Sequence, residues 1–272
     1  MSNTDTGFEF SVNRMAALVR RYWYLLVSSW PRLLDLIYWP MVQMLMWGFL
    51  QLYVSQNSGF FAQAAGVFIG SVLLWDILFR GQLGFSISFL EEMWARNLGN
   101  LMMSPLRPAE FIAALMIMSL VRLAIGMIPV SILAIVFFGF NLWSMGLALV
   151  AFFINLILTS WAIGIFVAGL LLRNGMGAES MAWTIMFLFL PLTCVYYPVA
   201  VLPEWLQYVA WSLPPTYVFE GMRALLIDHV FRADLMLAAF GFNAVLFAAA
   251  AYAFVRLLES AREQGSLLQA GE

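Results

Sequence analysis

Two long stretches of this chain carry no charged residue, and they limit what it can fold into. No Asp, Glu, Lys or Arg occurs in the forty residues between Asp35 and Asp76, or in the fifty between Arg122 and Arg173. One crossing of a lipid bilayer takes about twenty apolar residues. The whole chain is 64% hydrophobic and 10% charged, whereas about a quarter of the residues in soluble domains are charged. We therefore expect an all-α integral membrane protein.

Short polar or proline-containing breaks divide the apolar sequence into six predicted transmembrane helices. Ser55–Gly59 separates the first two, and Gly139–Asn141 forms a natural turn between the third and fourth. The expected organisation is an amphipathic N-terminal segment, residues 1–35, and a six-span region, residues 36–272, within a single domain. The six predicted spans are Leu36–Val54, Phe60–Leu90, Phe111–Phe138, Leu142–Leu172, Met181–Val195 and Leu235–Leu258.

A basic, aromatic-rich helix is predicted at Phe8–Ser29. Its cations Arg14, Arg20 and Arg21 are interspersed with apolar side chains. This pattern is typical of helices that lie in the headgroup layer of a membrane with the apolar side down.

Between the second and third predicted spans, Glu91–Met103 has the pattern of a short amphipathic helix outside the membrane. It opens with the paired acids Glu91 and Glu92. Ser104–Pro105 ends it, because proline lacks an N–H donor and disfavours helix in the residue before it. A short helix held between two spans is well placed to pass a push from a soluble partner to both of them.

The segment Tyr196–Ile227, between the fifth and sixth predicted spans, is rich in proline and aromatic residues. It is too broken to span a membrane and too apolar for a solvated loop. We predict two short helices, Glu204–Ser212 and about Pro215–Ile227, which dip into the outer interface, where aromatic side chains are favoured.

The arginines predict the orientation. With six spans both termini share one side, which would hold nine arginines, while the opposite side would hold Arg223 and Arg232. Short loops rich in Arg and Lys stay in the cytoplasm. We therefore expect both termini and the Glu91–Met103 helix to be cytoplasmic.

Three ionisable residues, Asp76, Arg80 and Arg122, fall inside predicted spans, where charges are costly and usually paired. Asp76 lies fifteen residues before Glu91, and Arg122 lies fifteen residues after Arg107. Antiparallel spans would bring the two to similar depth, which predicts an Asp76–Arg122 pair, with Asp76–Arg80 as the competitor at i,i+4. The pair would be a structural pin between helices or a polar element of a transport path.

The chain offers little for catalysis. His229 is the only histidine and Cys194 the only cysteine, which excludes a multi-histidine or multi-cysteine metal site. No Gly-rich phosphate loop ending in Lys-Ser/Thr occurs, so the chain cannot bind ATP in the P-loop manner. We expect no catalytic residue, no bound cofactor and no metal on this chain.

Six spans, a basic amphipathic lead-in and an acidic helix after the second span together resemble the ABC-2 type family of ABC transporter permeases. Two stretches carry the resemblance most specifically. The first is similar to the family's acidic loop that ends in a proline turn: Leu90-Glu91-Glu92, Asn100, Pro105-Leu106-Arg107 and Glu110. The second is similar to the family's tyrosine-proline and leucine-proline signature before the last span: Tyr197-Pro198, Leu202-Pro203-Glu204, Leu213-Pro214-Pro215, Tyr217, Glu220 and Arg223.

The resemblance implies a permease subunit of the bacterial inner membrane that exports an amphipathic cargo, such as a glycan, a lipid or a drug-like molecule. It implies a homodimer or paired permease in the lipid bilayer with two cytoplasmic ATPase subunits, which would bind ATP and Mg²⁺ on a separate chain, and no nucleic-acid partner. Phe8–Ser29 would be the connecting helix and Glu91–Met103 the coupling helix. The implied ATPase-coupling residues are Glu91, Glu92, Met93, Trp94, Arg96, Asn97 and Leu98. The implied outer gate comprises Tyr197, Pro198, Pro203, Trp205, Pro214, Tyr217, Glu220 and Arg223.

Two other classes of protein stay open. An ATPase-independent channel or secondary transporter predicts a membrane-centred ionisable network and repeat symmetry, and the sequence offers Asp76, Arg80 and Arg122 for such a network. A membrane enzyme or assembly scaffold needs interfacial clusters of His, Asp or Ser, and the sequence has none.

Overall fold

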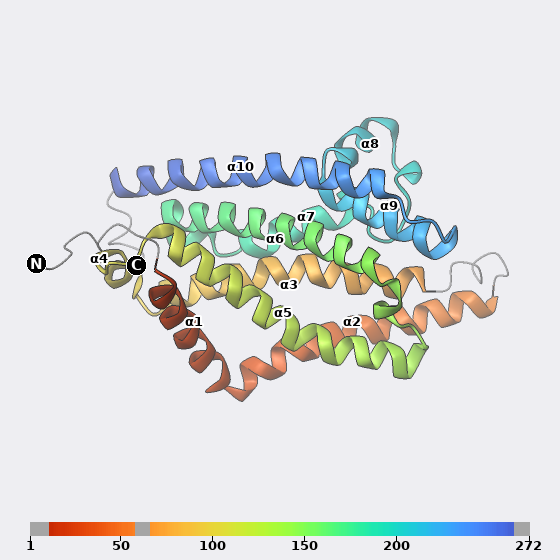
Figure 1. Cartoon of the computed structure of the whole chain (residues 1–272), viewed down its shortest axis with the longest axis horizontal. Coiled ribbons are helices and arrows are strands. Elements are labelled where there is room, and N and C mark those ends of the chain that lie inside the picture. Colours follow the sequence, from red (N-terminus) through yellow and green to blue (C-terminus); the bar gives the residue numbers. More distant parts are fainter. Residues whose placement is uncertain (1–10, 58–65, 264–272) are drawn as a thin grey trace, which may run out of the picture.

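The computed structural model describes residues 11–57 and 66–263, and every element in these ranges is helical. The long helices lie side by side in an elongated bundle, with α4 at one end (the α4 end) and α8 and α9 at the other (the α9 end; Figure 1). The all-α prediction is confirmed for the described residues. In chain order the elements are α1 Val12–Val27, α2 Trp30–Asn57, α3 Val67–Trp94, α4 Leu98–Met103, α5 Pro108–Phe138, η1 Leu142–Met145, α6 Leu147–Asn174, η2 Gly175–Ala178, α7 Met181–Leu192, η3 Val199–Val201, α8 Glu204–Trp211, α9 Pro214–Ile227 and α10 Ala233–Glu263.

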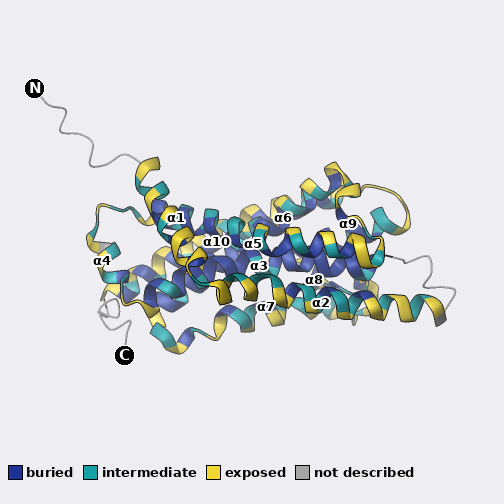
Figure 2. Ribbon diagram, turned by 90° about the horizontal axis from the view of Figure 1, so that it is seen from below, coloured by how far each residue is buried: buried dark blue, intermediate teal, exposed yellow. Residues whose placement is uncertain are grey.

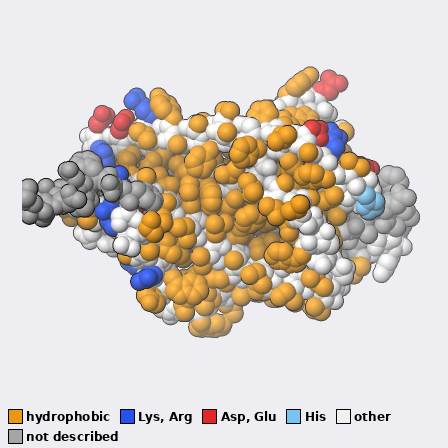
Figure 3. All heavy atoms as spheres, in the orientation of Figure 1, with side chains coloured by type: hydrophobic (Ala, Val, Ile, Leu, Met, Phe, Trp, Pro, Cys, Tyr) orange, Lys and Arg blue, Asp and Glu red, His pale blue; other side chains and the backbone are white. Residues whose placement is uncertain are grey.

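Within the described part of the chain, five helices, α2, α3, α5, α6 and α10, are long and apolar enough to cross a membrane. The face seen in Figure 3 agrees with this, since charged side chains lie toward its two ends and a broad hydrophobic band lies between them. The protein is therefore a multi-pass membrane protein.

The predicted fifth span, Met181–Val195, corresponds to the shorter helix α7. It has 12 residues, roughly 18 Å at 1.5 Å per residue, whereas the hydrocarbon core of a bilayer is about 30 Å thick. The helix ends at Leu192, directly after Pro191, whose missing N–H weakens the last turn. The count of six spans thus stays a prediction.

The first long helix begins before the predicted start of the first span at Leu36. α2 already begins at Trp30, so Pro31 stands in its first turn, where a missing N–H costs no intrahelical hydrogen bond. Toward its other end α2 stays helical to Asn57, through most of the predicted break at Ser55–Gly59. The predicted start of the second span at Phe60 lies outside the described residues.

The predicted turn at Gly139–Asn141 is confirmed, but the fourth long helix begins later than expected. The side-chain Oδ1 of Asn141 accepts a hydrogen bond from the Trp143 N–H at 3.0 Å. This bond caps the start of the short 3₁₀ helix η1, which occupies Leu142–Met145, and α6 starts at Leu147 and not at Leu142.

Helix α3 is the centre of the bundle. Trp94 is its only exposed residue, and the helix contacts α2, α5, α6, α7 and α9 (Figure 2). Glycines bring its neighbours close: a Cβ at Gly84 would lie 3.1 Å from the Cα of Ser119 on α5, and one at Gly81 would lie 2.5 Å from the Ser160 Oγ on α6. Small residues at such contacts let membrane helices pack backbone to backbone.

A buried network of hydrogen bonds joins α6 to α10. Thr159 Oγ1 donates to Asn243 Oδ1 at 2.6 Å, and Asn243 Nδ2 donates to the backbone and side-chain oxygens of Asn155 at 3.0 and 3.1 Å. Both asparagines and the threonine are buried. In hydrocarbon these groups have no water to bond instead, so the network favours one register of α10 on α6.

The two short helices predicted between the last two spans are present. α8 covers Glu204–Trp211 and α9 covers Pro214–Ile227, within one residue of the predicted limits. Their position in the outer membrane interface stays a prediction.

We expect the substitution Asn243→Ala to destabilise the protein by about 1 kcal/mol, because it removes the contact from α10 to both Asn155 and Thr159. Reversible unfolding in mixed micelles measures this change. Leu237→Ala, on the exposed face of the same helix, is the matched control. A loss no larger than that of the control would show that the network adds nothing to stability.

Candidate functional site

The predicted coupling helix Glu91–Met103 is not one helix. α3 runs on through Glu91 and Glu92 and ends at Trp94, and α4 begins at Leu98. Arg96, with φ of 51°, takes the left-handed conformation between them. The N–H of Arg96 donates to Met93 O at 2.9 Å and that of Asn97 to Glu92 O at 2.9 Å, the two bonds of a Schellman helix end. Glycine usually occupies this position, so an arginine there gives no sequence signal.

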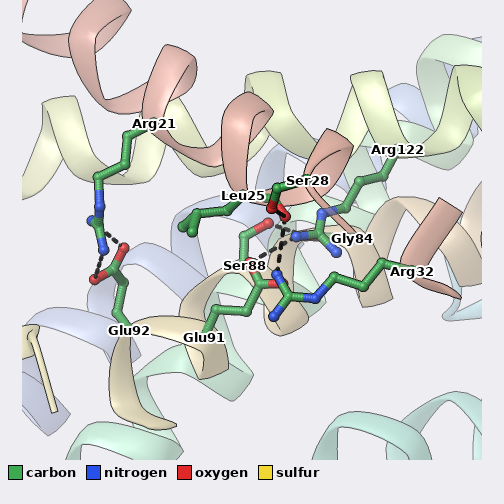
Figure 4. A network of polar contacts seen from close by, with 9 residues as sticks. All are labelled: Arg21, Leu25, Ser28, Arg32, Gly84, Ser88, Glu91, Glu92 and Arg122. Carbon is green, nitrogen blue, oxygen red and sulfur yellow. Dashed lines mark hydrogen bonds and ion pairs between the residues drawn. The ribbon is translucent and has the colours of Figure 1, made fainter. Parts of the chain in front are cut away.

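Glu92 lies in the last turns of α3, and its carboxylate is 1% exposed. Two nitrogens of Arg21 on α1 donate to it, Nη1 at 2.5 Å and Nη2 at 3.1 Å (Figure 4). Asn97 Nδ2 also donates to it, at 2.7 Å. This forked geometry is the strongest form of arginine–carboxylate pair. Glu92 therefore fixes α1 against the end of α3.

Glu91 faces a different pair of helices. Its Oε2 accepts from Arg122 Nη2 of α5 at 2.8 Å, and its Oε1 lies 3.5 Å from Arg32 Nη1 of α2 (Figure 4). Arg32 also donates to the backbone oxygen of Leu25 near the end of α1, at 3.2 Å. One carboxylate thus joins α3 to α2 and α5.

Glu110, in the first turn of α5, is a third buried carboxylate. It accepts from Arg14 Nη2 at 2.6 Å and Nε at 3.0 Å, and from the backbone N–H groups of Ser11 at 2.7 Å and Arg107 at 3.1 Å. The hydrogen bond to Glu110 raises the pKa of Arg14 above its ordinary value. We call the whole group the carboxylate clamp: Glu91, Glu92 and Glu110 with Arg14, Arg21, Arg32 and Arg122.

The clamp changes how the predicted coupling residues are understood. Glu92, Met93 and Leu98 are buried and Glu91 is nearly so. These side chains therefore contact other residues of this protein and are not available to a partner. Asn97 is half-buried on Glu92, while Trp94 and Arg96 are exposed. The exposed side chains next to the clamp form what we call the apex surface: Trp94, Ala95, Arg96, Asn100 and Met103. The turn before α7 approaches it, since Trp94 Nε1 donates to Glu179 Oε2 at 3.4 Å.

The predicted Asp76–Arg122 pair is wrong. Arg122 pairs with Glu91, and Asp76 is paired within its own helix with Arg80, whose Nε lies 3.6 Å from Asp76 Oδ1. Side chains lean toward the N-terminus of their helix. Because α3 and α5 are antiparallel, Arg122 leans toward the α4 end and Asp76 toward the α9 end. The close approach of Gly84 to Ser119 also sets the two about five residues out of register, roughly 7 Å.

At the α9 end, Glu220 is the centre of a second polar cluster. Arg223 donates to it through Nη2 at 3.0 Å, and the N–H of Val199 donates to its Oε1 at 2.7 Å. Arg223 also reaches the backbone oxygen of Val195 at 3.3 Å. α9 thus holds the segment that precedes α8.

The other predicted gate residues surround this cluster in different ways. Tyr217 OH donates to Trp211 O and Tyr197 OH donates to Pro191 O, both at 2.7 Å, which ties each hydroxyl to backbone. Pro203 is the N-cap of α8, Pro214 is in the first turn of α9, and Trp205 is exposed. A cavity of about 630 Å³ opens here, lined by Val67, Phe68, Tyr196, Pro198, Trp211, Glu220, Arg223 and neighbouring residues of α9, α10 and the turn between them. Across residues 11–57 and 66–263 no three His, Cys, Asp or Glu side chains gather as a metal-ligand set.

We expect Arg21→Ala to loosen α1, because it removes the forked bond to a buried carboxylate. The loss should be about 1–2 kcal/mol, since Arg21 is itself partly solvated, so amide hydrogen exchange across α1 should speed up about tenfold. The neighbouring residue provides the control: Arg20 is exposed, and Arg20→Ala should leave exchange within about 0.5 kcal/mol of wild type. Equal effects of the two substitutions would contradict the clamp.

A comparison with protein families places this architecture. The family described as ABC-2 type transporter matches residues 14–227, a range that begins at the Arg14 of the clamp and ends with α9. A comparison with curated protein sequences gave no significant match. Since the family match covers most of the chain, including the clamp, the apex surface and the Glu220 cluster, the protein belongs to the ABC-2 type transporter family.

Proposed function

We propose that this chain is the transmembrane subunit of an ATP-driven exporter in the bacterial inner membrane, and that it works as a homodimer with two separate cytoplasmic ATPase subunits. The observation that carries the proposal is the pairing of an exposed apex surface with a buried clamp directly behind it. Trp94 and Arg96 are residue types that dominate protein–protein contacts, and they stand on the end of the central helix.

The clamp supplies a route for a push from the ATPase. A soluble subunit can shift the permease only by contacting its two states differently. A displacement of the apex moves the end of α3, and Glu91 and Glu92 bind arginines of α1, α2 and α5 at that end. A contact at the apex surface would therefore move the ends of four helices together, α1, α2, α3 and α5.

The charge distribution supports a cytoplasmic position for the apex. Arg14, Arg21, Arg32, Arg96 and Arg122 all belong to the clamp or the apex surface, and α10 also ends at the α4 end (Figure 1). Under the positive-inside rule this end faces the cytoplasm. The α9 end, with the Glu220 cluster and its cavity, would then be the outer gate through which an amphipathic cargo leaves.

An ATPase-independent transporter is the second candidate, and one observation favours it. Asp76 is fully buried and neither of its oxygens makes a hydrogen bond. Arg80, at 3.6 Å, is its ion-pair partner. Unsatisfied charges at this depth are costly and often functional.

Purification of the tagged chain from its native cells in mild detergent, followed by mass spectrometry, tests the main proposal. We expect a P-loop ATPase to co-purify with the wild-type chain. Trp94→Ala and Arg96→Glu should each lower its recovery about tenfold or more, the size of a central contact. Arg96→Gly should act in the same direction, since glycine suits the left-handed turn and only the side chain is lost.

Trp205→Ala is the matched control, because Trp205 is an exposed tryptophan on α8 at the opposite end of the bundle. It should leave the recovery of the ATPase unchanged. Wild-type recovery by all three apex variants would refute docking at the apex. Absence of any P-loop ATPase from the wild-type purification would refute the main proposal and favour the second candidate, with Asp76 as the residue to change next.

A further inference from the structure

A recessed slot lies between α5 and α6. It has a volume of about 430 Å³, within the range of ligand pockets, and its floor includes Ile77 of the central helix. The walls come from α5, η1 and α6, and include Ala124, Ile128, Trp143, Val150 and Phe153.

The lining offers almost nothing to a polar ligand. Apart from the indole of Trp143, the polar side chain in it is Ser131, whose hydroxyl donates to Ile128 O at 2.9 Å. Apolar cavities of this kind stay dry and take apolar ligands. Ions, sugars and headgroups would lose their hydration here and gain no hydrogen bond.

The slot opens away from the protein. Ala124, Ile128, Trp143 and Val150 are exposed at its mouth. Three of these four residues belong to α5 and α6, which are long and apolar enough to cross the membrane. The medium at the mouth is therefore the hydrocarbon of the bilayer.

The length of the slot matches one leaflet. Along α5 it runs from Leu120, near the middle of the helix, to Ser131, roughly 16 Å at 1.5 Å per residue. Half of the hydrocarbon core is about 15 Å. The slot closes at the α5–α6 turn with Trp143, and tryptophan is favoured at the membrane interface.

The geometry points to a binding site for one acyl chain of a membrane phospholipid, from the leaflet at the α9 end. The headgroup would lie beside η1, with the chain running down to Leu120. A second copy of this protein is the alternative occupant, and the test below distinguishes the two. This inference needs only a multi-pass membrane protein and does not depend on the ATPase partner.

The test uses the full chain in vesicles of phosphatidylcholine that contain a small fraction of the same lipid with a photoreactive diazirine in one acyl chain. After irradiation, mass spectrometry maps the labelled residues. We expect labelling of Ile128, Val150 and Phe153 to exceed that of the exposed α10 residues Val245 and Tyr252 about tenfold, which is the effect of about two additional buried methylenes. Ala124→Phe fills the mouth and should remove this excess.

Ala248→Phe, the same change at an exposed alanine of α10, is the control and should keep the excess. Val150→Trp, which blocks the slot from the α6 side, guards against a folding defect in the first variant and should give the same loss at Ile128 and Phe153. Equal labelling of the slot and the α10 face would overturn the site, because the lipid in the slot would then be ordinary bulk lipid. The site would also be overturned if chemical cross-linking joined the slot to a second copy of the protein and lipid labelling of the slot were absent.

Discussion

The burial of three carboxylates at one end of the bundle determines where its helices can lie. Glu91, Glu92 and Glu110 are withdrawn from water, and an unpaired charge in such a place would cost several kcal/mol. Each needs a cation, and the cations stand on other helices. The position of α1 follows from this requirement together with the burial of Leu18, Tyr22 and Leu26 in the core.

Helix α3 connects the carboxylate clamp to the opposite end of the bundle. It is continuous from Val67 to Trp94, roughly 42 Å long, and it is buried along almost its whole length. One end carries Glu91 and Glu92, and at the other Val67 and Phe68 line the cavity beside Glu220. Glycine contacts with α5 and α6 leave it little room to bend. Under the proposed function, this one helix would carry a displacement at the apex to the opposite end.

Hydrophobicity predicted the long helices well, because the length of an apolar run follows directly from bilayer thickness. Interactions between helices were harder. The prediction of the Asp76–Arg122 pair rests on depth alone. On antiparallel helices the two side chains lean toward opposite ends of the bundle, which separates them. Glu91 and Glu92 looked like docking acids because nothing in one sequence reveals that Arg21 and Arg122, far along the chain, cover them. The end of α3 was not predicted, because Arg96 occupies the left-handed position at which a glycine would have indicated a helix end.

The clamp also limits where the bundle can change shape. Movement of α1, α2 or α5 relative to α3 at the α4 end breaks ion pairs to buried carboxylates, so these helix ends move together. Bending costs less at Pro40 in α2 and Pro129 in α5, since each proline has already removed a backbone hydrogen bond. Pro129 adjoins Ile128 in the wall of the apolar slot. Any bend of α5 at Pro129 alters the width of the slot. A ligand in the slot therefore favours the shape of α5 in which the slot fits that ligand best.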